Sequence, residues 1–226
     1  MYKKGYKIRD FFGKYLTRLF IIIVLVSILF PLIWMFSLAF RKTGETNLSR
    51  FLIVPVNVET GNFSAAIENA LSRGYSIPAL FKNSLIVTIF SIILTIILAT
   101  IAGYAYAKFK FKGRMPLFYY ILIGMMIPAQ ALLIPIFILT KYMHLLNTYA
   151  SLILTYIAFG LPISIFIMRG FFMGISNSMI EAARIDGATE FGVFLRIALP
   201  IAKPAIATCV ILLFLQNWNE FTLALD

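Results

Sequence analysis

The sequence predicts an all-α fold, a polytopic bundle of transmembrane helices. Hydrophobic residues make up 61% of the 226 residues and charged residues only 13%, whereas soluble domains average about 45–50% apolar and about 25% charged residues. The apolar residues also form long stretches almost without charge. These stretches do not alternate between apolar and polar residues as barrel strands do, and lipid offers the backbone no hydrogen-bond partner, so we expect helices.

Five stretches are long enough to cross a bilayer as a helix, which takes about 20 residues. The predicted spans are residues 19–40, 83–107, 115–140, 145–168 and 204–225. The first follows basic residues, as the apolar core of a signal peptide does, but such a core usually has about 7–15 residues and precedes a small-residue cleavage site. We therefore expect a retained first helix. Kinks are expected at Pro128, Pro135 and Pro162.

The distribution of basic residues predicts the orientation of the spans. Fourteen of the twenty Lys and Arg residues lie in segments 1–18, 108–114 and 169–203, and six lie in the alternate segments 41–82 and 141–144. Because basic loops stay in the cytoplasm, we predict a cytoplasmic N-terminal segment over residues 1–18 and a transmembrane domain over residues 19–226. The net charge of +11 is then mainly an insertion signal, and no nucleic-acid partner is expected.

Two loops between the spans are long. The outer loop, residues 41–82, contains glycine and proline among mixed polar residues and is predicted to be irregular, with one short helix near residues 65–71. The inner loop, residues 169–203, predicts a helix–turn–helix on the cytoplasmic side. Ser178 and Glu181 have the spacing of a capping box, so the first helix is predicted over residues 178–186.

Gly187 would close this first helix in the left-handed conformation. A second helix is predicted over residues 189–197, ending before Leu199-Pro200. Another surface is expected to cover the apolar residues of this second helix, which are Phe191, Val193, Phe194 and Leu195. From periodicity alone, a helical hairpin that packs on its own spans and has no partner is equally consistent.

A longer motif in the inner loop points to a family. Glu181-Ala182-Ala183 is followed after three residues by Gly187, and after nine more by Ile197-Ala198-Leu199-Pro200. This pattern resembles the EAA loop of ABC-importer permease subunits. Other segments are similar to the second permease of maltose-type carbohydrate importers, namely Ala102-Gly103-Tyr104-Ala105, Phe111-Lys112-Gly113, Met126-Ile127-Pro128-Ala129-Gln130, Ile185-Asp186-Gly187-Ala188 and Trp218-Asn219-Glu220-Phe221.

The sequence departs from this family at two points. The turn before the EAA helix often contains proline in the family, but is Gly174-Ile175-Ser176-Asn177 here. Such permeases also normally have six membrane helices and a cytoplasmic tail, whereas five spans are predicted here. We therefore expect this sequence to be a fragment or to lack one helix.

The resemblance implies a transport subunit of the prokaryotic plasma membrane that is not itself an enzyme. A coupling helix in the inner loop would dock on a separate ATPase dimer, which would bind ATP and Mg²⁺, since this chain has no G-x-x-x-x-G-K-[ST] loop. A second permease subunit and an extracytoplasmic solute-binding protein would complete an importer for di- or oligosaccharides. The residues implied in coupling are Glu181, Ala182, Ala183, Asp186, Gly187, Ile197, Leu199 and Pro200.

A sugar path is predicted from polar groups within the spans, since such groups tend to line cavities or helix contacts. At about 1.5 Å per residue, residue 130 and residue 218 would lie at a similar depth. An alternative is that these side chains serve helix packing and anchor the helix at the membrane interface. The candidate residues are Gln130, Asn217, Trp218, Asn219 and Glu220.

Other function classes have less support. A secondary carrier or channel without an ATPase is the alternative, but it would need intramembrane charges or inverted repeats, and only Glu220 qualifies. An enzyme would need a nucleophile–base pair or a metal cluster. The sequence has a single histidine, His144, and a single cysteine, Cys209, so we expect no metal site and no bound cofactor.

Overall fold

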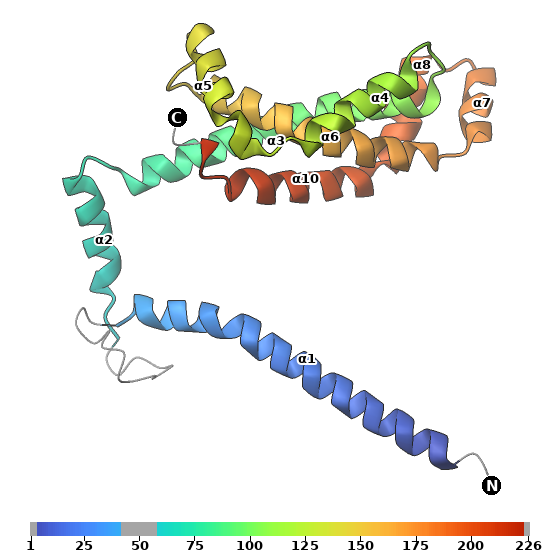
Figure 1. The fold of residues 1–226 in the computed structure, drawn as a ribbon. Helices are drawn as coiled ribbons and strands as arrows, with labels where there is room; N and C mark the ends of the chain where they lie inside the picture. The colour runs from blue at the N-terminus through green and yellow to red at the C-terminus, as the bar shows by residue number, and fades with distance from the viewer. Residues whose placement is uncertain (1–3, 42–57, 224–226) are drawn as a thin grey trace. The chain divides into compact units, whose positions relative to one another are not determined.

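The computed structural model describes residues 4–41 and 58–223, with side chains described from Gly13 onward. Every regular element in these ranges is a helix, so the prediction of an all-α fold is confirmed (Figure 1). The chain divides into two compact units, Met1–Ile77 and Pro78–Asp226, and each is described by itself. Residues 42–57 of the predicted outer loop lie outside the described residues.

The described residues of the first unit form a long helix and a short one. Helix α1 (Lys4–Ala39) is about 54 Å long at 1.5 Å per residue, and its segment Gly13–Ala39 is apolar enough to cross a membrane. It begins before the predicted residue 19, because the basic residues ahead of the apolar stretch are good helix formers. Helix α2 (Gly61–Ser72) contains the short helix predicted near residues 65–71.

Polar and aromatic contacts hold the end of α1 to the start of α2. The Asn62 side-chain amide donates to the backbone oxygens of Ala39, at 3.0 Å, and Arg41, at 2.7 Å. The carbonyls at the end of a helix have no partner within the helix, so Asn62 supplies one. The Phe40 ring packs edge-on against Phe63, with 5.5 Å between centroids.

The second unit is built on three helices that lie side by side (Figure 1): α3 (Ile77–Lys108), α6 (Tyr149–Met173) and α10 (Lys203–Trp218). Helix α3 begins within the predicted outer loop, 41–82, and six residues before the predicted span start at residue 83, because Pro78 suits the first turn of a helix. Helix α6 continues through Arg169 into the predicted inner loop, 169–203, since a charged residue ends an apolar stretch without ending a helix.

Two glycines let these three helices pack closely against one another. A Cβ added at Gly103 in α3 would lie 2.7 Å from the Met168 Cβ in α6. One added at Gly160 in α6 would lie 2.5 Å from the Leu213 Cδ2 in α10. Small residues at helix crossings are typical of membrane proteins, in which close backbone approach contributes to association.

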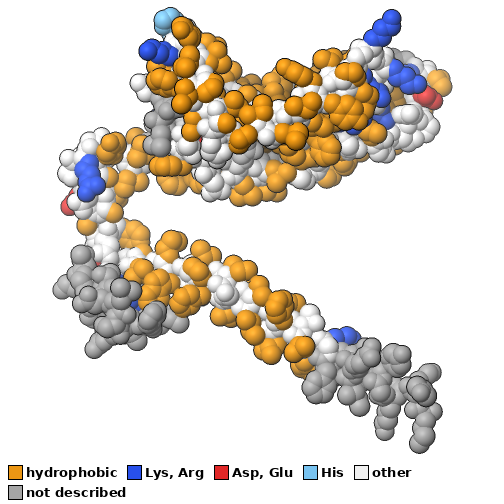
Figure 2. Space-filling view, in the orientation of Figure 1, with side chains coloured by type: hydrophobic (Ala, Val, Ile, Leu, Met, Phe, Trp, Pro, Cys, Tyr) orange, Lys and Arg blue, Asp and Glu red, His pale blue; other side chains and the backbone are white. Residues whose placement is uncertain are grey.

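Helix α3 buries polar side chains and exposes apolar ones. Thr88, Ser91, Thr95 and Thr100 are almost completely buried, while Ile93 and Ile97 are about half exposed. Apolar side chains cover much of the visible surface of the second unit (Figure 2). This distribution is the reverse of that in a soluble protein and matches a surface in contact with lipid.

The third predicted span, residues 115–140, is not one kinked helix. Helix α4 (Arg114–Ile123) runs into a 3₁₀ turn, η1 (Gly124–Met126), and a second turn, η2 (Ala129–Leu132), leads into α5 (Leu133–Tyr142). The two halves bend by 93°. The backbone is extended at Ile127 and Pro128, because a residue that precedes proline avoids the helical region.

The prediction of a kink at Pro135 is also wrong. Pro135 lies in the first turn of α5, where the missing N–H of proline breaks no hydrogen bond. By contrast, Pro162 does lie inside the long helix α6, where the sequence placed it.

The last predicted span also differs from the structure. Helix α8 (Glu190–Val193), a π-helical turn η3 (Phe194–Ala198) and α9 (Leu199–Ile201) precede α10, with a bend of 69°. The helical path therefore continues through Leu199-Pro200, because Pro200 occupies the first turn of α9 and needs no N–H there. Helix α10 ends at Trp218, not at residue 225. Among the described residues, three unbroken helices and two bent pairs give three to five candidate spans.

Candidate functional site

The helix that carries the EAA motif is α7 (Asn177–Ile185), at one end of the second unit (Figure 1). Ser176 is its N-cap residue, and the hydroxyl groups of Ser176 and Ser178 lie 2.6 Å apart. The capping box predicted from Ser178 and Glu181 is therefore wrong, because Ser178 lies inside the first turn. A capping box requires its serine to be outside the helix, with non-helical dihedrals.

The turn after α7 follows the prediction. Gly187 has φ of +85°, a conformation that favours glycine over residues with a side chain. The Gly187 N–H donates to the Arg184 carbonyl, and the Ala188 N–H donates to the Ala183 carbonyl, both at 3.0 Å. Helix α8 then begins after Thr189, whose hydroxyl accepts from the Gly192 N–H at 3.1 Å. A short, tightly closed turn thus joins the two helices.

An ion pair crosses this turn and was missed by the sequence analysis. The Arg184 Nε lies 2.6 Å from Glu190 Oε1, and the Arg184 Nη2 donates to Glu190 Oε2 at 3.0 Å. Hydrogen bonding to Glu190 raises the pKa of Arg184 above its usual value. Paired bonds from one guanidinium to one carboxylate fix relative orientation. The pair therefore holds α8 in a defined position relative to α7.

The EAA motif is mostly exposed in its first half. Glu181, Ala182, Asp186 and Gly187 are exposed, and Ala183 is half-buried against the core. Ile185 is 86% exposed, whereas Ile180 is only 3% exposed and anchors α7. The outer face of α7 is therefore free to contact another molecule.

The second half of the motif has a different role. Ile197 and Leu199 are half-buried and Pro200 is exposed, within η3 and α9. Ile197 packs against the core of the unit. Ile197 thus attaches the loop to the core of the unit, and neither Ile197 nor Leu199 extends the exposed surface of α7.

Half of the apolar residues that we expected to be covered are covered. Val193 is fully buried, and the Phe194 ring packs on Tyr104 of α3 with 5.0 Å between centroids. Phe191 and Leu195 remain exposed, at 68% and 41%. Together with Ile185 of α7, Phe191 leaves apolar surface on the loop for a partner to cover.

Lys108 attaches the turn before α7 to the end of α3. Its ammonium group donates to the Ile175 carbonyl at 2.6 Å and to the Asn177 side-chain oxygen at 2.9 Å. This contact joins residues almost seventy positions apart, so no local pattern in the sequence could indicate it. It shows how the turn is held without the proline that the family often has there.

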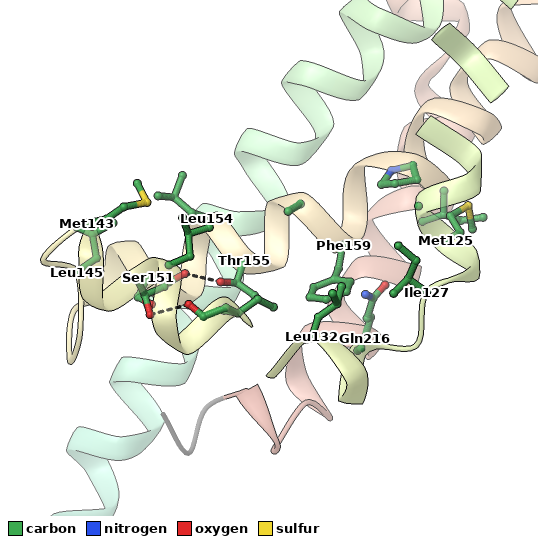
Figure 3. A pocket seen from close by; sticks show the side chains of 18 residues that line it. Met125, Ile127, Leu132, Met143, Leu145, Ser151, Leu154, Thr155, Phe159 and Gln216 are labelled. Atoms are coloured by element: carbon green, nitrogen blue, oxygen red, sulfur yellow. Dashed lines mark hydrogen bonds between the residues drawn. The ribbon is translucent and has the colours of Figure 1, made fainter. Parts of the chain in front are cut away.

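A pocket of about 610 Å³ lies beside the break in the third span. It is bounded by η1, η2, α5 and α6, and by Gln216 of α10. In Figure 3, the Gln216 side chain lies beside Phe159, Leu132 and Ile127. Most of the lining is apolar, and the polar groups come from Thr140, Ser151, Thr155 and Gln216. This composition is usual for a small-molecule site, in which few polar groups fix orientation.

The predicted sugar-path residues do not all lie together. Gln130 is exposed on η2 and does not line the pocket. Asn217 is buried, with a side-chain nitrogen that has no acceptor among the described residues. Trp218 packs between the rings of Phe81 and Phe214, each 5.4 Å away.

The remaining two predicted residues make local contacts. Asn219 is exposed and donates from its side chain to the Leu215 carbonyl at 2.8 Å. Glu220 accepts from the Tyr156 hydroxyl at 3.2 Å and from the Leu223 N–H at 2.8 Å. These contacts hold the segment after α10 against α6. Gln216, which lines the pocket, was missed because neighbouring residues on a helix point about 100° apart.

The side chains that the structure describes contain no group of three or more His, Cys, Asp and Glu residues that could hold a metal ion. What the second unit offers is a closely packed set of membrane helices, a pocket at a broken span and an exposed loop at one end. These features define the chain as a membrane-embedded helical protein with a loop that is free to contact another molecule.

Comparisons with known proteins identify the family. Residues 91–225 match the family of binding-protein-dependent transport system inner membrane components, and this chain belongs to that family. It is 34% identical over 215 residues to a probable ABC transporter permease protein, YurM, of Bacillus subtilis, covering 95% of this chain and 69% of the relative.

Two further relatives are named for the sugars of their systems. The diacetylchitobiose uptake system permease protein NgcG of Streptomyces coelicolor is 35% identical over 198 residues, covering 88% of this chain and 64% of the relative. The arabinooligosaccharides transport system permease protein AraQ of Bacillus subtilis is 39% identical over 141 residues, covering 62% of this chain and 50% of the relative. The chain thus spans 50% to 69% of the length of these three relatives.

A solved structure has the same fold. It is the crystal structure of a bacterial ABC transporter involved in the import of the acidic polysaccharide alginate. The similarity has a TM-score of 0.78 at 25% sequence identity and covers 97% of this chain and 74% of the matched chain.

Proposed function

We propose that this chain is a transmembrane permease subunit of an ATP-driven importer that moves a di- or oligosaccharide into a prokaryotic cell by alternating access. The observation that carries the proposal is helix α7, which presents the Glu-Ala-Ala motif on an exposed face and is closed by left-handed Gly187. Family membership supports the transport role. The N-terminus and the loop that contains α7 face the cytoplasm in this proposal, as the basic segments favour.

ATP and Mg²⁺ would be bound by a partner ATPase dimer, against which α7 docks. The exposed Glu181 suits a basic residue of that partner, and exposed Ile185 and Phe191 supply the apolar contact. A second permease subunit, forming a heterodimer with this chain, and an extracytoplasmic solute-binding protein complete the proposed assembly. Closure of the ATPase dimer would displace α7 and, through α8 and η3, the N-terminal end of α10.

The proposed substrate class is supported by relatives that are named for diacetylchitobiose, arabinooligosaccharides and trehalose. We place the sugar path along the side of the unit that holds the pocket, where Gln216 and the exposed Gln130 supply hydrogen-bonding amides. Asn217, Trp218, Asn219 and Glu220 then shape the end of α10 beside that path.

The proposal is tested by co-purification from the native membrane in mild detergent. Glu181→Lys changes an exposed side chain with no hydrogen bond or ion pair among the described residues, so the variant should fold normally. We expect it to lose the ATPase while retaining the second permease. Glu68→Lys on α2 is the matched control, since it makes the same charge change at an exposed site outside the motif.

Two outcomes would contradict the proposal. One is that the unaltered chain purifies without any ATPase and sugar uptake persists without ATP, which would favour a carrier or channel. The other is that Glu181→Lys retains the ATPase as fully as Glu68→Lys does, which would remove α7 as the docking helix.

A further inference from the structure

The loop between α3 and α4, residues 109–113, is a charged surface to which the proposed function assigns an orientation but no ligand. Lys110 and Lys112 lie within it, and Lys108 and Arg114 lie at its two ends. No Asp or Glu occurs anywhere between Glu68 and Glu181, so this part of the chain has no acidic residue close in sequence to balance the charge.

Two of these basic side chains have structural roles. Lys108 holds the turn before α7. Arg114 is half-buried and donates from Nη1 to the Phe109 carbonyl at 3.1 Å, which closes the loop on itself. Gly113, with φ of +83°, reverses the chain directly before α4. The loop is therefore a defined structure and not an extended linker.

The other two basic side chains are exposed and unpaired. Among the described residues, the only ion pair joins Arg184 and Glu190, and neither Lys110 nor Lys112 takes part in a hydrogen bond there. Both line a shallow pocket of about 560 Å³ that is formed only by residues 110–116. The same pocket includes Arg114, so three basic residues line one concave surface.

A fourth positive charge lies behind this pocket. The Arg169 guanidinium carbon lies 4.2 Å from the centre of the Phe118 ring, and its Nη2 contacts the Met115 sulfur at 3.7 Å. The Arg169 Nε is buried with no acceptor among the described residues. None of these contacts neutralises the guanidinium, so its charge adds to the positive potential over Met115.

The surroundings of the pocket are apolar and exposed. Phe111 is 42% exposed, Leu117 51% and Tyr120 76%. Basic side chains beside exposed aromatic rings are typical of the level at which lipid headgroups meet the hydrocarbon region. In Figure 2, Lys and Arg side chains gather at the end of the second unit where Figure 1 places α7 and α8.

We propose that residues 110–116 bind the headgroup phosphate of an anionic phospholipid in the cytoplasmic leaflet, with Lys110, Lys112 and Arg114 as its cationic contacts. The choice of leaflet rests on the orientation in the proposed function. Lipid is the occupant because the positive pocket complements an anionic headgroup and the adjacent exposed rings complement acyl chains. Basic pockets beside membrane helices on the cytoplasmic side bind anionic headgroups in this way.

The test measures lipid binding by native mass spectrometry of the full chain purified in mild detergent. Dioleoyl phosphatidylglycerol and dioleoyl phosphatidylcholine are titrated separately, and we expect the chain to prefer phosphatidylglycerol. Each basic residue near an anionic surface contributes about fivefold to affinity, so Lys110→Gln with Lys112→Gln should weaken phosphatidylglycerol binding about 25-fold. Lys110→Arg with Lys112→Arg should preserve it.

Lys82→Gln with Lys141→Gln is the matched control, because it removes the same charge from two exposed lysines outside the loop. Phosphatidylglycerol preference that survives in the 110/112 variant, or that falls equally in the control, would overturn the proposal. A third measurement adds inorganic phosphate without lipid. Binding of phosphate as tight as that of phosphatidylglycerol would identify a free-anion site and would also overturn it.

The same preparation separates this proposal from the proposed function. ATPase co-purification tests the importer assignment, whereas lipid binding needs neither ATPase nor transport. If the double variant Lys110→Gln, Lys112→Gln loses the ATPase but keeps its preference for phosphatidylglycerol, the loop is a protein contact and not a lipid site.

Discussion

Gly187 shows how one residue can determine the shape of the turn between α7 and α8. Its φ of +85° costs a residue with a Cβ about 1–2 kcal/mol. Gly187→Ala should therefore lower the thermal stability of the purified chain in detergent and weaken ATPase co-purification. Gly187→Asn should have a smaller effect, since asparagine tolerates the left-handed region better.

Gly170→Ala is the control for this substitution. A Cβ at Gly170 meets nothing within 4 Å, and this glycine lies within helix α6. We expect Gly170→Ala to be neutral or slightly stabilising, because alanine is the better helix former. Equal stability of the alanine variants at positions 170 and 187 would contradict the role given to the left-handed turn.

Single residues also mark where sequence reasoning reaches its limit. The left-handed Gly187 could be predicted, because the Asp-Gly pair ends a helical pattern. The N-cap could not be assigned reliably, because Ser176 and Ser178 are both good capping residues and only the entry of the chain from α6 selects the first. Gln216 was missed because nothing in the sequence states which face of α10 meets the break in the third span.

At the level of elements, the Arg184–Glu190 ion pair should determine how firmly α7 and α8 move together. Arg184→Glu or Glu190→Arg alone places like charges opposite each other across the turn. Each single variant should therefore couple ATP hydrolysis to transport less well, measured as sugar transported per ATP hydrolysed in proteoliposomes. The double variant restores an opposite-charge pair and should recover most of the coupling.

This charge reversal separates positioning from folding. A purely structural loss would lower expression and leave the transport ratio of the surviving protein unchanged. If the double variant is no better than the worse single variant, the ion pair does not position the two helices.

The contact between α3 and α6 gives a second prediction at this level. A Cβ at Gly103 would lie 3.0 Å from the backbone nitrogen of Arg169 as well as 2.7 Å from the Met168 Cβ, and neither atom can move freely. Gly103→Ala should therefore destabilise the unit by about 1–3 kcal/mol, the usual cost of overpacking. Thermal unfolding in detergent measures the effect.

Gly160→Ala should cost less than Gly103→Ala, because its closest neighbour is the end of the flexible Leu213 side chain. Replacing Leu213 by alanine in the same chain should relieve the clash. The interpretation of these helix contacts would be wrong if Gly103→Ala were tolerated as well as Gly160→Ala.

The positions of the spans were largely predictable, and their shapes were not. Charge-free stretches located every long helix, because crossing lipid requires about 20 apolar residues. The Ile127-Pro128 pair indicated a distortion, but its 93° bend depends on how α4 and η1 pack against α6. The continuation of helix through Leu199-Pro200 was missed because proline was interpreted as a stop rather than as a first-turn residue.

For the whole molecule, the proposed orientation predicts which sites react from each side of the membrane. Cys209 is the single cysteine, so Cys209→Ala gives a background without thiols. Ile185→Cys on α7 and Tyr142→Cys on α5 then introduce thiols at sites that are 86% and 80% exposed, at opposite ends of the second unit (Figure 1).

A maleimide that cannot cross membranes should label Tyr142→Cys in intact cells and Ile185→Cys only after the membrane is opened. Labelling of both in intact cells, or the reverse pattern, would contradict the assignment of the loop with α7 to the cytoplasm. The unsubstituted background should remain unlabelled under both conditions.

The glycine contact at position 103 has a mechanical consequence. The backbones of α3 and α6 meet there with few flexible side chains between them to absorb strain, so these two helices should tilt together as one rigid body. Deformation of the second unit is then concentrated at two bends in the helical path, at Ala202 and at residues 127–128. A displacement of α7 would then reach the pocket as a rotation about these two bends, with little side-chain repacking inside the rigid body.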